Sequence, residues 1–391
     1  MFHINPYRPG AGMMPTYLAG RDNDIYEVEQ LFKAMKAGIP VQSVIFSGLR
    51  GVGKTVLINK LQRKAEENGI FCKHIEIEEK NDFISQIAAC SQSFLRSASM
   101  TGKLQAFIET AMLYIKSLVI SFDPSNNSFS LSTQERDLYS TNNLTQSLTD
   151  VFTSIGEIAS KIGTPICFFV DEIQYMKQKE LGSLIAALHR SNQLGYPIMI
   201  IGAGLPKVFK MLSDEKTYSE RLFIYKEIDS LDSEQAKKAI TIPAEQVGVK
   251  YTDDAVNEIV SITKGYPFFI QQFCEIIFKN SASLIEESDV IKCVDDFYQK
   301  LDSGFFKVRY ERCSDSEKSF IFAMVSCGEL PCTTSNIASK LQKPVNGISP
   351  ARAQLIAKGI IYPVKHGKLD FTVPQFEMFI KRSDEYNAWL K

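Results

Sequence analysis

Hydrophobic and polar residues form two patterns along this chain: apolar residues at helical spacing, and short continuous apolar runs. Apolar residues return every three or four positions in several stretches, the first being "GRDNDIYEVEQLFKAMKAG", which predicts an amphipathic helix ending near Gly38. Between such stretches lie short, continuous apolar runs, which are typical of buried strands: "QSVIFSG" (42–48), "FCKHIEIEE" (71–79), "TPICFFVDEIQ" (164–174) and "PIMIIGAG" (197–204). The alternation predicts a parallel sheet flanked by helices.

The region between the second and third apolar runs is less regular. The pattern predicts helices at 82–100, 104–119 and 144–163, and a polar hairpin over 120–134 with a turn at Asp123 to Asn127. After residue 204 we expect the α/β alternation to stop, because the following segments up to about Lys300 have only helical spacing. Their expected caps are Asp232 or Ser233, and Thr252.

From about Leu301 the order of predicted elements is three helices and a short hairpin, the order found in a winged helix. The third helix is expected to have Ser349 as its cap, Pro350 at its first position and Gly359 at its end. The final segment, with the single tryptophan Trp389, is expected to pack onto this module as a tail.

Composition narrows the class of protein only slightly. The chain has 391 residues, room for two or three domains, and a net charge of −1, which leaves no overall charge signature for nucleic acid or membrane. No apolar run is long enough to span a bilayer, and the start "MFHINPYRPG" lacks signal-peptide features, so we expect a soluble, cytoplasmic protein with no membrane partner. The cysteines form no CxxC pair, so we expect neither a structural metal nor a disulfide.

The segment "GLRGVGKT" matches the pattern G-x-x-x-x-G-K-[ST] and lies between a predicted strand and a predicted helix. Backbone N–H groups of such a loop hold phosphate oxygens, the lysine reaches the β- and γ-phosphates, and the hydroxyl binds Mg²⁺. A glycine-rich turn without this role would not need Lys54 and Thr55. The expected nucleotide-binding residues are Gly48, Leu49, Arg50, Gly51, Val52, Gly53, Lys54, Thr55 and Val56.

The acidic pair in "FFVDE" is the expected partner of this loop. A buried strand would deliver Asp171 to the carboxyl edge of the sheet, where it could hold Mg²⁺ together with Thr55. Glu172 would then orient or deprotonate an attacking water, so a glutamate here favours hydrolysis over binding alone. The expected catalytic residues on this reading are Lys54 and Glu172.

Taken in order, the motifs resemble those of AAA+ ATPases, and most of all a prokaryotic group related to archaeal origin-recognition-type initiators and to STAND ATPases. The resemblance covers nearly the whole chain and is carried by "PGAGMMPTYLAGRD", "GLRGVGKTVL", "FFVDEIQ", "ALHRSNQLGYPIMIIGAGLP", "YSERLF", "GYPFFIQ" and "FTVPQF". It implies ATP and Mg²⁺ as ligands and hydrolysis of ATP to ADP and phosphate, slow or stimulated by a partner.

The resemblance also implies a domain organisation. It comprises an N-terminal arm (1–19), a P-loop ATPase core (20–228) with an insertion at about 117–140, a helical lid (229–300) and a winged-helix domain (301–391). In such proteins the "AGRD" segment lies beside the adenine, which makes Arg21, with its neighbours Gly20 and Asp22, a candidate base contact.

Three further positions gain roles from the resemblance. Arg221 in "SERLF" stands where many AAA+ proteins place an arginine finger, although a structural ion pair is an equal alternative. The sensor-1 position, which commonly carries a polar residue, is Gly202-Ala203-Gly204 here, so that side chain is absent or replaced. "GYPFFIQ" is similar to the GxP motif of STAND ATPases, which puts Pro267 near the adenine and favours a switch over a fast motor.

The output of this switch stays open at the level of sequence. Residues 301–391 carry roughly four more basic than acidic residues, and the candidates for contact with double-stranded DNA are Arg352, Gln354, Lys358, Lys365 and Lys368. Winged helices also dock proteins. The two hypotheses are a nucleotide-gated protein that binds or remodels DNA, and a STAND-like switch that acts on a protein partner or on further copies of itself.

Overall fold

The computed structural model describes residues 4–78, 83–99, 104–122, 144–217, 219–280, 283–365 and 367–390. They form two compact units. The sheet unit comprises Arg21–Gly48 and Lys54–Ile228. The helical unit comprises Met1–Gly20, Leu49–Gly53 and Asp229–Lys391. The middle of the phosphate motif therefore packs with the helical unit, whereas its two flanks belong to the sheet unit.

The sheet unit is built on five parallel strands in the order β2-β3-β4-β1-β5. The strands are β1 (Ser43–Ser47), β2 (Phe71–Glu76), β3 (Ile166–Asp171), β4 (Ile198–Gly204) and β5 (Phe223–Glu227). The four predicted strands are confirmed, but the expectation that the α/β pattern stops after residue 204 is wrong. β5 is an edge strand beside β1, with only its first residue buried, so it lacks the apolar run that marks the other strands.

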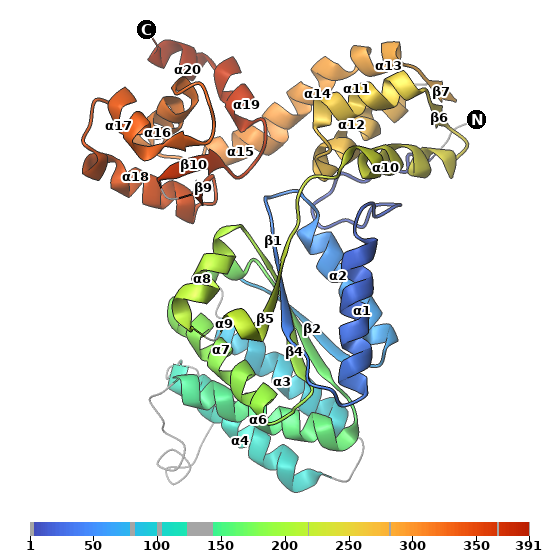
Figure 1. The fold of residues 1–391 in the computed structure, drawn as a ribbon, viewed down its shortest axis with the longest axis vertical. Helices are drawn as coiled ribbons and strands as arrows, with labels where there is room; N and C mark the ends of the chain where they lie inside the picture. Colours follow the sequence, from blue (N-terminus) through green and yellow to red (C-terminus); the bar gives the residue numbers. More distant parts are fainter. Residues whose placement is uncertain are drawn as a thin grey trace. The chain divides into compact units, whose positions relative to one another are not determined.

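Helices cover both faces of this sheet (Figure 1). They are α1 (Asp22–Lys36), α2 (Lys54–Glu67), α3 (Phe83–Ser99), α4 (Gln105–Phe122), α6 (Leu144–Ile162), α7 (Gln178–Gln193), α8 (Lys207–Glu215) and α9 (Ser219–Leu222). The expected hairpin is wrong in its first three residues, because α4 continues to Phe122, and its remainder lies outside the described residues.

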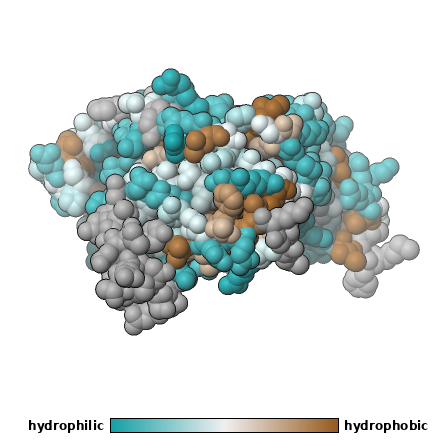
Figure 2. Space-filling view, turned by 90° about the horizontal axis from the view of Figure 1, so that it is seen from below, coloured by the Kyte–Doolittle hydropathy of each residue, from teal (hydrophilic) through white to brown (hydrophobic). Residues whose placement is uncertain are grey.

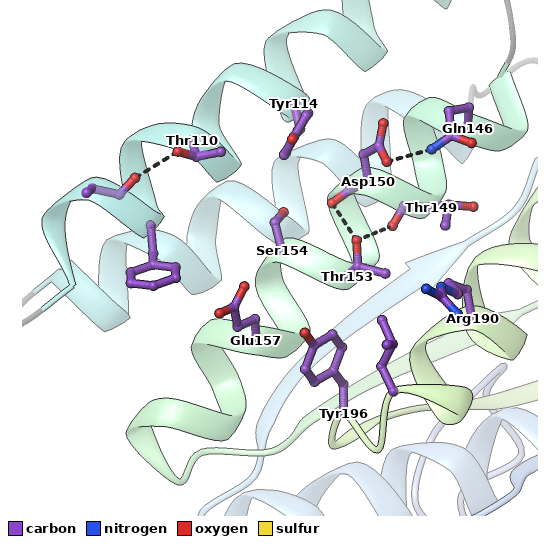
Figure 3. Close-up of a pocket in the computed structure, with 13 residues that line it drawn as sticks. Thr110, Tyr114, Gln146, Thr149, Asp150, Thr153, Ser154, Glu157, Arg190 and Tyr196 are labelled. Atoms are coloured by element: carbon purple, nitrogen blue, oxygen red, sulfur yellow. Dashed lines mark hydrogen bonds between the residues drawn. The ribbon is translucent and has the colours of Figure 1, made fainter.

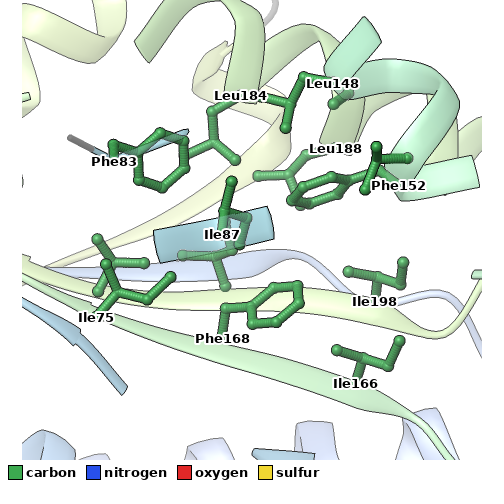
Figure 4. Packing of buried hydrophobic residues seen from close by; sticks show 14 of the residues in the cluster. Ile75, Phe83, Ile87, Leu148, Phe152, Ile166, Phe168, Leu184, Leu188 and Ile198 are labelled. Atoms are coloured by element: carbon green, nitrogen blue, oxygen red, sulfur yellow. The ribbon is translucent and has the colours of Figure 1, made fainter. Parts of the chain in front are cut away.

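The main apolar core lies between the sheet and helices α3, α6 and α7. Figure 4 shows strand residues Ile166, Phe168 and Ile198 facing the side chains of these helices. The rings of Phe168 and Phe152 pack with their centroids 5.9 Å apart, and both side chains are fully buried. Burial on this scale holds the strand that ends at Asp171 in place.

The helical unit begins with the N-terminal arm, which is extended and packed. Tyr7 is buried, donates a hydrogen bond to the Ile240 carbonyl and contacts the ring of Phe278. The segment predicted as a lid, called the lid below, contains α10 (Ser233–Glu245), α11 (Asp253–Thr263), α12 (Pro267–Asn280), α13 (Glu287–Lys292) and α14 (Val294–Lys300). The predicted caps are confirmed, since Asp232 accepts from Gln235 N and Thr252 accepts from Ala255 N.

A continuous helical run joins the lid helices to the C-terminal module, which we define as residues 311–390. α14 passes into a π-helical turn (Leu301–Phe306) and then into α15 (Lys307–Tyr310). Phe306 of this turn is fully buried and packs edge-on against Phe269 of the lid and face-on against Phe379 of the module. The predicted boundary at residue 300 therefore falls inside a continuous helical run, which contacts both the lid and the module through Phe306.

The C-terminal module has the predicted order of helices and hairpin. Its elements are α16 (Asp315–Ser326), β8 (Cys332–Thr333), α17 (Thr334–Lys340), α18 (Val345–Ala357), β9 (Ile361–Lys365), β10 (Lys368–Phe371), α19 (Phe376–Arg382) and α20 (Asp384–Trp389). The strands form an antiparallel sheet in the order β8-β10-β9. The terminal segment packs on the module as predicted, with Trp389 against Phe322.

The predicted start of α18 is wrong. The helix begins at Val345, so Ser349 and Pro350 lie inside its first two turns, and the Ser349 hydroxyl bonds to the Val345 carbonyl. Pro350 is the sixth residue of α18, beyond the four N–H groups that lack an intrahelical partner, so it leaves the helix without one N–H donor near its start. The predicted end is confirmed, because Gly359 follows the last turn with a φ of +65°.

Lys358, at the end of α18, is part of a structural ion pair. Its Nζ lies 2.7 Å from Oε2 of Glu317 and 2.8 Å from the Arg312 carbonyl oxygen. The Glu317 side chain is only 4% exposed, and its Oε2 also accepts from Ser314 N, so it caps α16 as well. Burial by itself would raise the pKa of Glu317, but the hydrogen bonds from Lys358 and Ser314 prevail and lower it.

Apolar side chains on the face seen in Figure 2 occur in small groups among hydrophilic ones. Within the described residues, no helix is both long enough and apolar enough to cross a membrane.

Lys358→Ala should destabilise the module that contains Glu317. We expect a loss of about 1–3 kcal/mol in unfolding free energy, because the buried carboxylate keeps its desolvation cost without its partner. Urea unfolding followed by the fluorescence of Trp389, the single tryptophan, measures this. Since the pKa of Glu317 is lowered in the folded state, the pair stabilises above the ordinary glutamate pKa and this stabilisation disappears as the pH falls through the lowered value.

The exposed Lys368 supplies a matched control, and Lys368→Ala should change the unfolding free energy by less than about 0.5 kcal/mol. Equal unfolding midpoints for the two variants at neutral pH would contradict a structural role for Lys358.

Candidate functional site

In the sheet unit, the flanks of the phosphate motif lie at the carboxyl ends of β1 and β4. Gly48 N donates to the Gly204 carbonyl at 3.1 Å, which joins the motif to the end of β4. Lys54 begins α2, is only 7% exposed, and its Nζ lies 2.9 Å from the Gly48 carbonyl oxygen. Gly53 has a φ of +95°, in the region that favours glycine, so the turn before Lys54 needs a residue without Cβ.

Thr55 and Asp171 are brought together as the sequence predicts. The Thr55 hydroxyl donates to Asp171 Oδ2 at 2.6 Å. Burial is the main influence on Asp171 and raises its pKa; the Glu172 carboxylate raises it further, whereas the Thr55 hydrogen bond and the charge of Lys54 oppose the shift. A buried carboxylate beside a hydroxyl and a lysine fits Mg²⁺, which prefers hard oxygen ligands and few protein side chains.

Glu172 follows at once and turns the chain sharply. Its φ is 56°, in the left-handed region that non-glycine residues rarely adopt, and its N–H bonds to Asp171 Oδ1 at 2.8 Å. A 3₁₀ turn (Ile173–Tyr175) follows. Backbone strain of this kind costs about 1–3 kcal/mol and is concentrated at functional sites.

A residue that the sequence analysis missed completes this part of the site. Gln174 is 4% exposed; its Nε2 donates to the Glu172 carboxylate, and its Oε1 accepts from Leu205 N at 2.9 Å. The signal was available in "DEIQ", a polar residue two positions after the acidic pair. Its meaning depends on its contact with the end of β4, which the sequence alone does not reveal.

The end of β4, where the resemblance led us to expect a polar side chain, lies close to the 3₁₀ turn. A Cβ on Gly202 would lie 2.2 Å from Ile173 Cδ1, and a Cβ on Gly204 would lie 2.8 Å from Gln174 Oε1. A side chain at either position would therefore displace a side chain of the 3₁₀ turn.

In the helical unit, the middle of the phosphate motif (Leu49–Gly53) contacts the lid and the C-terminal module. The Tyr266 hydroxyl donates to the Arg50 carbonyl, and Phe268 N donates to the Gly51 carbonyl at 3.3 Å. Arg50 N donates to the Thr372 carbonyl at 3.4 Å. Gly51 has a φ of +89°, and a Cβ there would approach Tyr266 Cε1 to 3.0 Å.

Pro267 begins α12 directly after this tyrosine. The turn before it depends on Gly265, which has a φ of +70° and whose added Cβ would lie 2.2 Å from the Leu231 carbonyl oxygen. Leu231 N in turn bonds to the Gly265 carbonyl at 2.9 Å. The backbone of the GxP segment is therefore hydrogen-bonded to, and closely packed against, the residues just before α10.

The two arginine candidates lie in different settings within the sheet unit. Arg21 is 8% exposed and stands at the start of α1, where its carbonyl accepts from Ile25 N. Arg221 is exposed in α9, and its carbonyl accepts from Gln42 Nε2 at 2.8 Å. Among the described residues no acid pairs with the Arg221 side chain, so the structural ion pair considered as an alternative is not formed there.

The candidate DNA contacts are not equivalent. Gln354 and Lys368 are exposed, and Arg352 is half-buried with a buried Nε that has no partner among the described residues. Lys358 is committed to Glu317, so it is removed from the set. The side chain of Lys365 lies outside the described residues.

A separate hollow of about 590 Å³ lies between α4, α6 and α7 (Figure 3). Its charged lining residues are Asp150, Glu157 and Arg190, and Tyr114 and Tyr196 complete its rim. Burial raises the pKa of Asp150, although the hydrogen bond from Gln146 opposes this. None of the motif residues lines this hollow, so we do not assign it to the nucleotide.

Lys54→Ala should weaken ATP binding by at least about 100-fold, because a buried ammonium group beside the phosphates supplies a charge-assisted bond that alanine cannot replace. Isothermal titration with Mg·ATP measures the affinity. Arg63→Ala, an exposed cation further along α2, is the control and should bind like the wild type. Unchanged affinity in Lys54→Ala would overturn the assignment of the phosphate site.

Comparison with known proteins gives two family matches and several similar structures. Residues 17–201 match the AAA ATPase domain, and residues 303–380 match a domain of unknown function (DUF8462). A search of curated proteins returned no match.

Among solved structures, the Walker-type ATPase PABY2304 of Pyrococcus abyssi is similar with a TM-score of 0.55 and 15% identity, over 93% of this chain and 96% of that one. Orc1 of Aeropyrum pernix, solved with DNA, gives a TM-score of 0.47 and 13% identity over 96% of both chains. The Thermotoga maritima RuvB Holliday junction branch migration motor gives 0.47 and 14% over 93% and 96%.

The sequence match and the similarity to the Pyrococcus ATPase agree with the parallel sheet of the sheet unit. Residues 17–201, which include the phosphate motif, Asp171 and Glu172, are similar in sequence to the AAA ATPase domain.

Proposed function

We propose that this protein binds Mg·ATP, hydrolyses it to ADP and phosphate, and uses the nucleotide state to control its C-terminal module. The observation that supports hydrolysis best is the cluster of Thr55, Asp171 and Glu172, in which the first two share a hydrogen bond of 2.6 Å. A site for binding alone would not need a second carboxylate directly after the Mg²⁺ ligand.

Each residue has a separate task in this proposal. Lys54 neutralises charge on the β- and γ-phosphates, and the N–H groups of the glycine loop hold their oxygens. Thr55 and Asp171 hold Mg²⁺, which supplies neutralisation of the charge that develops during phosphoryl transfer. Glu172 orients the attacking water and accepts its proton. Arg21 and Pro267 are proposed neighbours of the adenine.

Control of the module is supported by contacts inside the helical unit. Arg50, in the middle of the phosphate motif, bonds through its carbonyl to Tyr266 of the lid and through its N–H to Thr372 of the module. A change in this loop on nucleotide binding would alter both contacts together. Phe306, which packs against both the lid and the module, would transmit any shift between them.

We further propose that Arg221 acts on the γ-phosphate of a neighbouring copy. It is exposed, and its four-residue helix holds it at a defined place before β5. Hydrolysis would then need an oligomer, because the charge that develops on the transferred phosphoryl group lacks this partner in a single chain.

ATPase activity per chain should therefore rise with protein concentration, and Arg221→Ala should lower the activity of the assembled form about 10³-fold or more. Arg190→Ala serves as the control, because Arg190 is an exposed arginine on α7 that lines the separate hollow. This variant should show the same rise of ATPase activity per chain with protein concentration as the wild type. Activity per chain that is independent of concentration and unaffected by Arg221→Ala would refute the finger.

For the output of the switch we propose double-stranded DNA. The module has the helix and hairpin order of a winged helix, and Lys368 stands exposed at the start of β10, beside the hairpin turn. α18 would offer Gln354 and Arg352 to a groove, and the lysines of the hairpin would contact phosphates.

A protein partner is the second candidate, and one observation favours it. The exposed residues of α18 are mostly uncharged and include Val345, Pro350 and Ala353. Such a face suits a protein contact better than a phosphate backbone. A STAND-like switch of this kind would hold its partner, or further copies of the chain, in the ATP state only.

Reversing charge at Arg352, Lys365 and Lys368 should weaken DNA binding at least about tenfold and flatten its salt dependence, because each lost phosphate contact removes about one unit of slope. Fluorescence anisotropy at several salt concentrations, with Glu172→Gln to hold the ATP state, measures both quantities. Lys381→Glu, an exposed lysine on α19, is the control. Unchanged affinity in the triple variant would contradict the DNA proposal, and an ATP-dependent change of assembly without DNA would support the protein alternative.

A further inference from the structure

We propose that Gln174 positions the catalytic glutamate and takes over the place of the polar side chain that β4 lacks. This inference rests on the proposed hydrolytic function of Glu172. It assigns a new role within that site, carried by a residue that neither binds Mg²⁺ nor belongs to the phosphate motif.

The first argument is the geometry of the Gln174 side chain. One end of its amide donates to the Glu172 carboxylate, and the other end accepts from Leu205 N at 2.9 Å, just beyond the last residue of β4. The bonds determine the orientation of the amide, because a backbone N–H needs the oxygen and a carboxylate needs the nitrogen. Gln174 is therefore a fixed bridge between Glu172 and β4.

The second argument is the space that holds this bridge. Gln174 is 4% exposed, and its Oε1 lies where even a Cβ on Gly204 would come within 2.8 Å of it. A side chain at residue 204 would therefore displace the amide of Gln174 from the place where it bonds to Leu205 N. Gly204 leaves the space that the amide of Gln174 occupies, so the polar group at the end of β4 comes from the 3₁₀ turn and not from the strand.

The third argument is the strained turn that brings the two residues together. Glu172 has a φ of 56°, and the Glu172 carbonyl accepts from Tyr175 N at 3.0 Å. This conformation folds the chain back so that side chains two positions apart can meet. Strain here is offset by the bonds that Gln174 makes at both of its ends.

The chemical consequence concerns the direction of the Glu172 carboxylate. A general base must be held within hydrogen-bonding reach of the water it activates, and a displacement of about 1 Å can cost about 100-fold in rate. Gln174 restrains the Glu172 carboxylate by donating a hydrogen bond to it. Because the restraint is anchored at Leu205 N, a shift at the end of β4 would move the base with it.

The test uses the full chain, Mg·ATP and steady-state kinetics. Gln174→Ala should lower kcat about 10- to 100-fold while KM and ATP affinity stay within about twofold. Gly204→Ala, which displaces Oε1 without removing it, should lower kcat in the same direction. Gln178→Ala, the same substitution at an exposed position four residues on, should match the wild type.

Two further readings separate positioning from a merely structural role. Gln174→Glu replaces the donating amide nitrogen by an oxygen that cannot donate to the Glu172 carboxylate, so it should lower kcat at least as much as Gln174→Ala while KM stays within about twofold. Adding Gly204→Ser to Gln174→Ala returns a polar group to the end of β4 and should restore part of kcat.

The outcomes are distinguishable. If the wild type hydrolyses ATP no faster than Glu172→Gln, the proposed function itself fails and this inference fails with it. If the wild type is active but Gln174→Ala has an unchanged or higher kcat, or Gln174→Glu keeps the wild-type kcat, only the role of Gln174 is overturned.

Discussion

Parallel pairing of β1, β4 and β3 is the constraint on which the site depends. The register sets Ser47 beside Gly204 and Val170 beside Gly202, so all three strands end at the same edge. Residues far apart along the chain, at 48, 54–55, 171–174 and 202–205, thereby meet. Each strand is buried along its length, and the core that buries them holds the positions of Thr55, Asp171 and Glu172.

The 3₁₀ turn after Glu172 lies close to the glycines at the end of β4. The polar group that bonds to both the Glu172 carboxylate and Leu205 N is the amide of Gln174, which belongs to this turn. The proposed role of Gln174 therefore depends on the packing of the turn against β4.

The helical unit adds a second constraint, centred on the middle of the phosphate motif. Arg50 and Gly51 bond to the lid and to the C-terminal module through backbone groups, which no sequence motif specifies. The phenylalanines of the π-helical turn pack against both parts, so lid and module form one packed body. π-helical turns often lie at functional positions, which agrees with a role for this turn in transmission.

The sequence by itself determined the strands with continuous apolar runs and the caps at Asp232 and Thr252, because these features depend on neighbours along the chain. It also predicts the chemistry of the "GLRGVGKT" and "DE" motifs. Only the tertiary structure decided the rest. β5 has no apolar run because it lies at a sheet edge. α18 begins at Val345, and the Ser349 hydroxyl bonds to the Val345 carbonyl within the helix instead of capping it. Lys358 is bound by a glutamate 41 positions away, and Gln174 gains its meaning from Leu205. Contacts between distant residues depend on burial and register, and neither is written in local sequence.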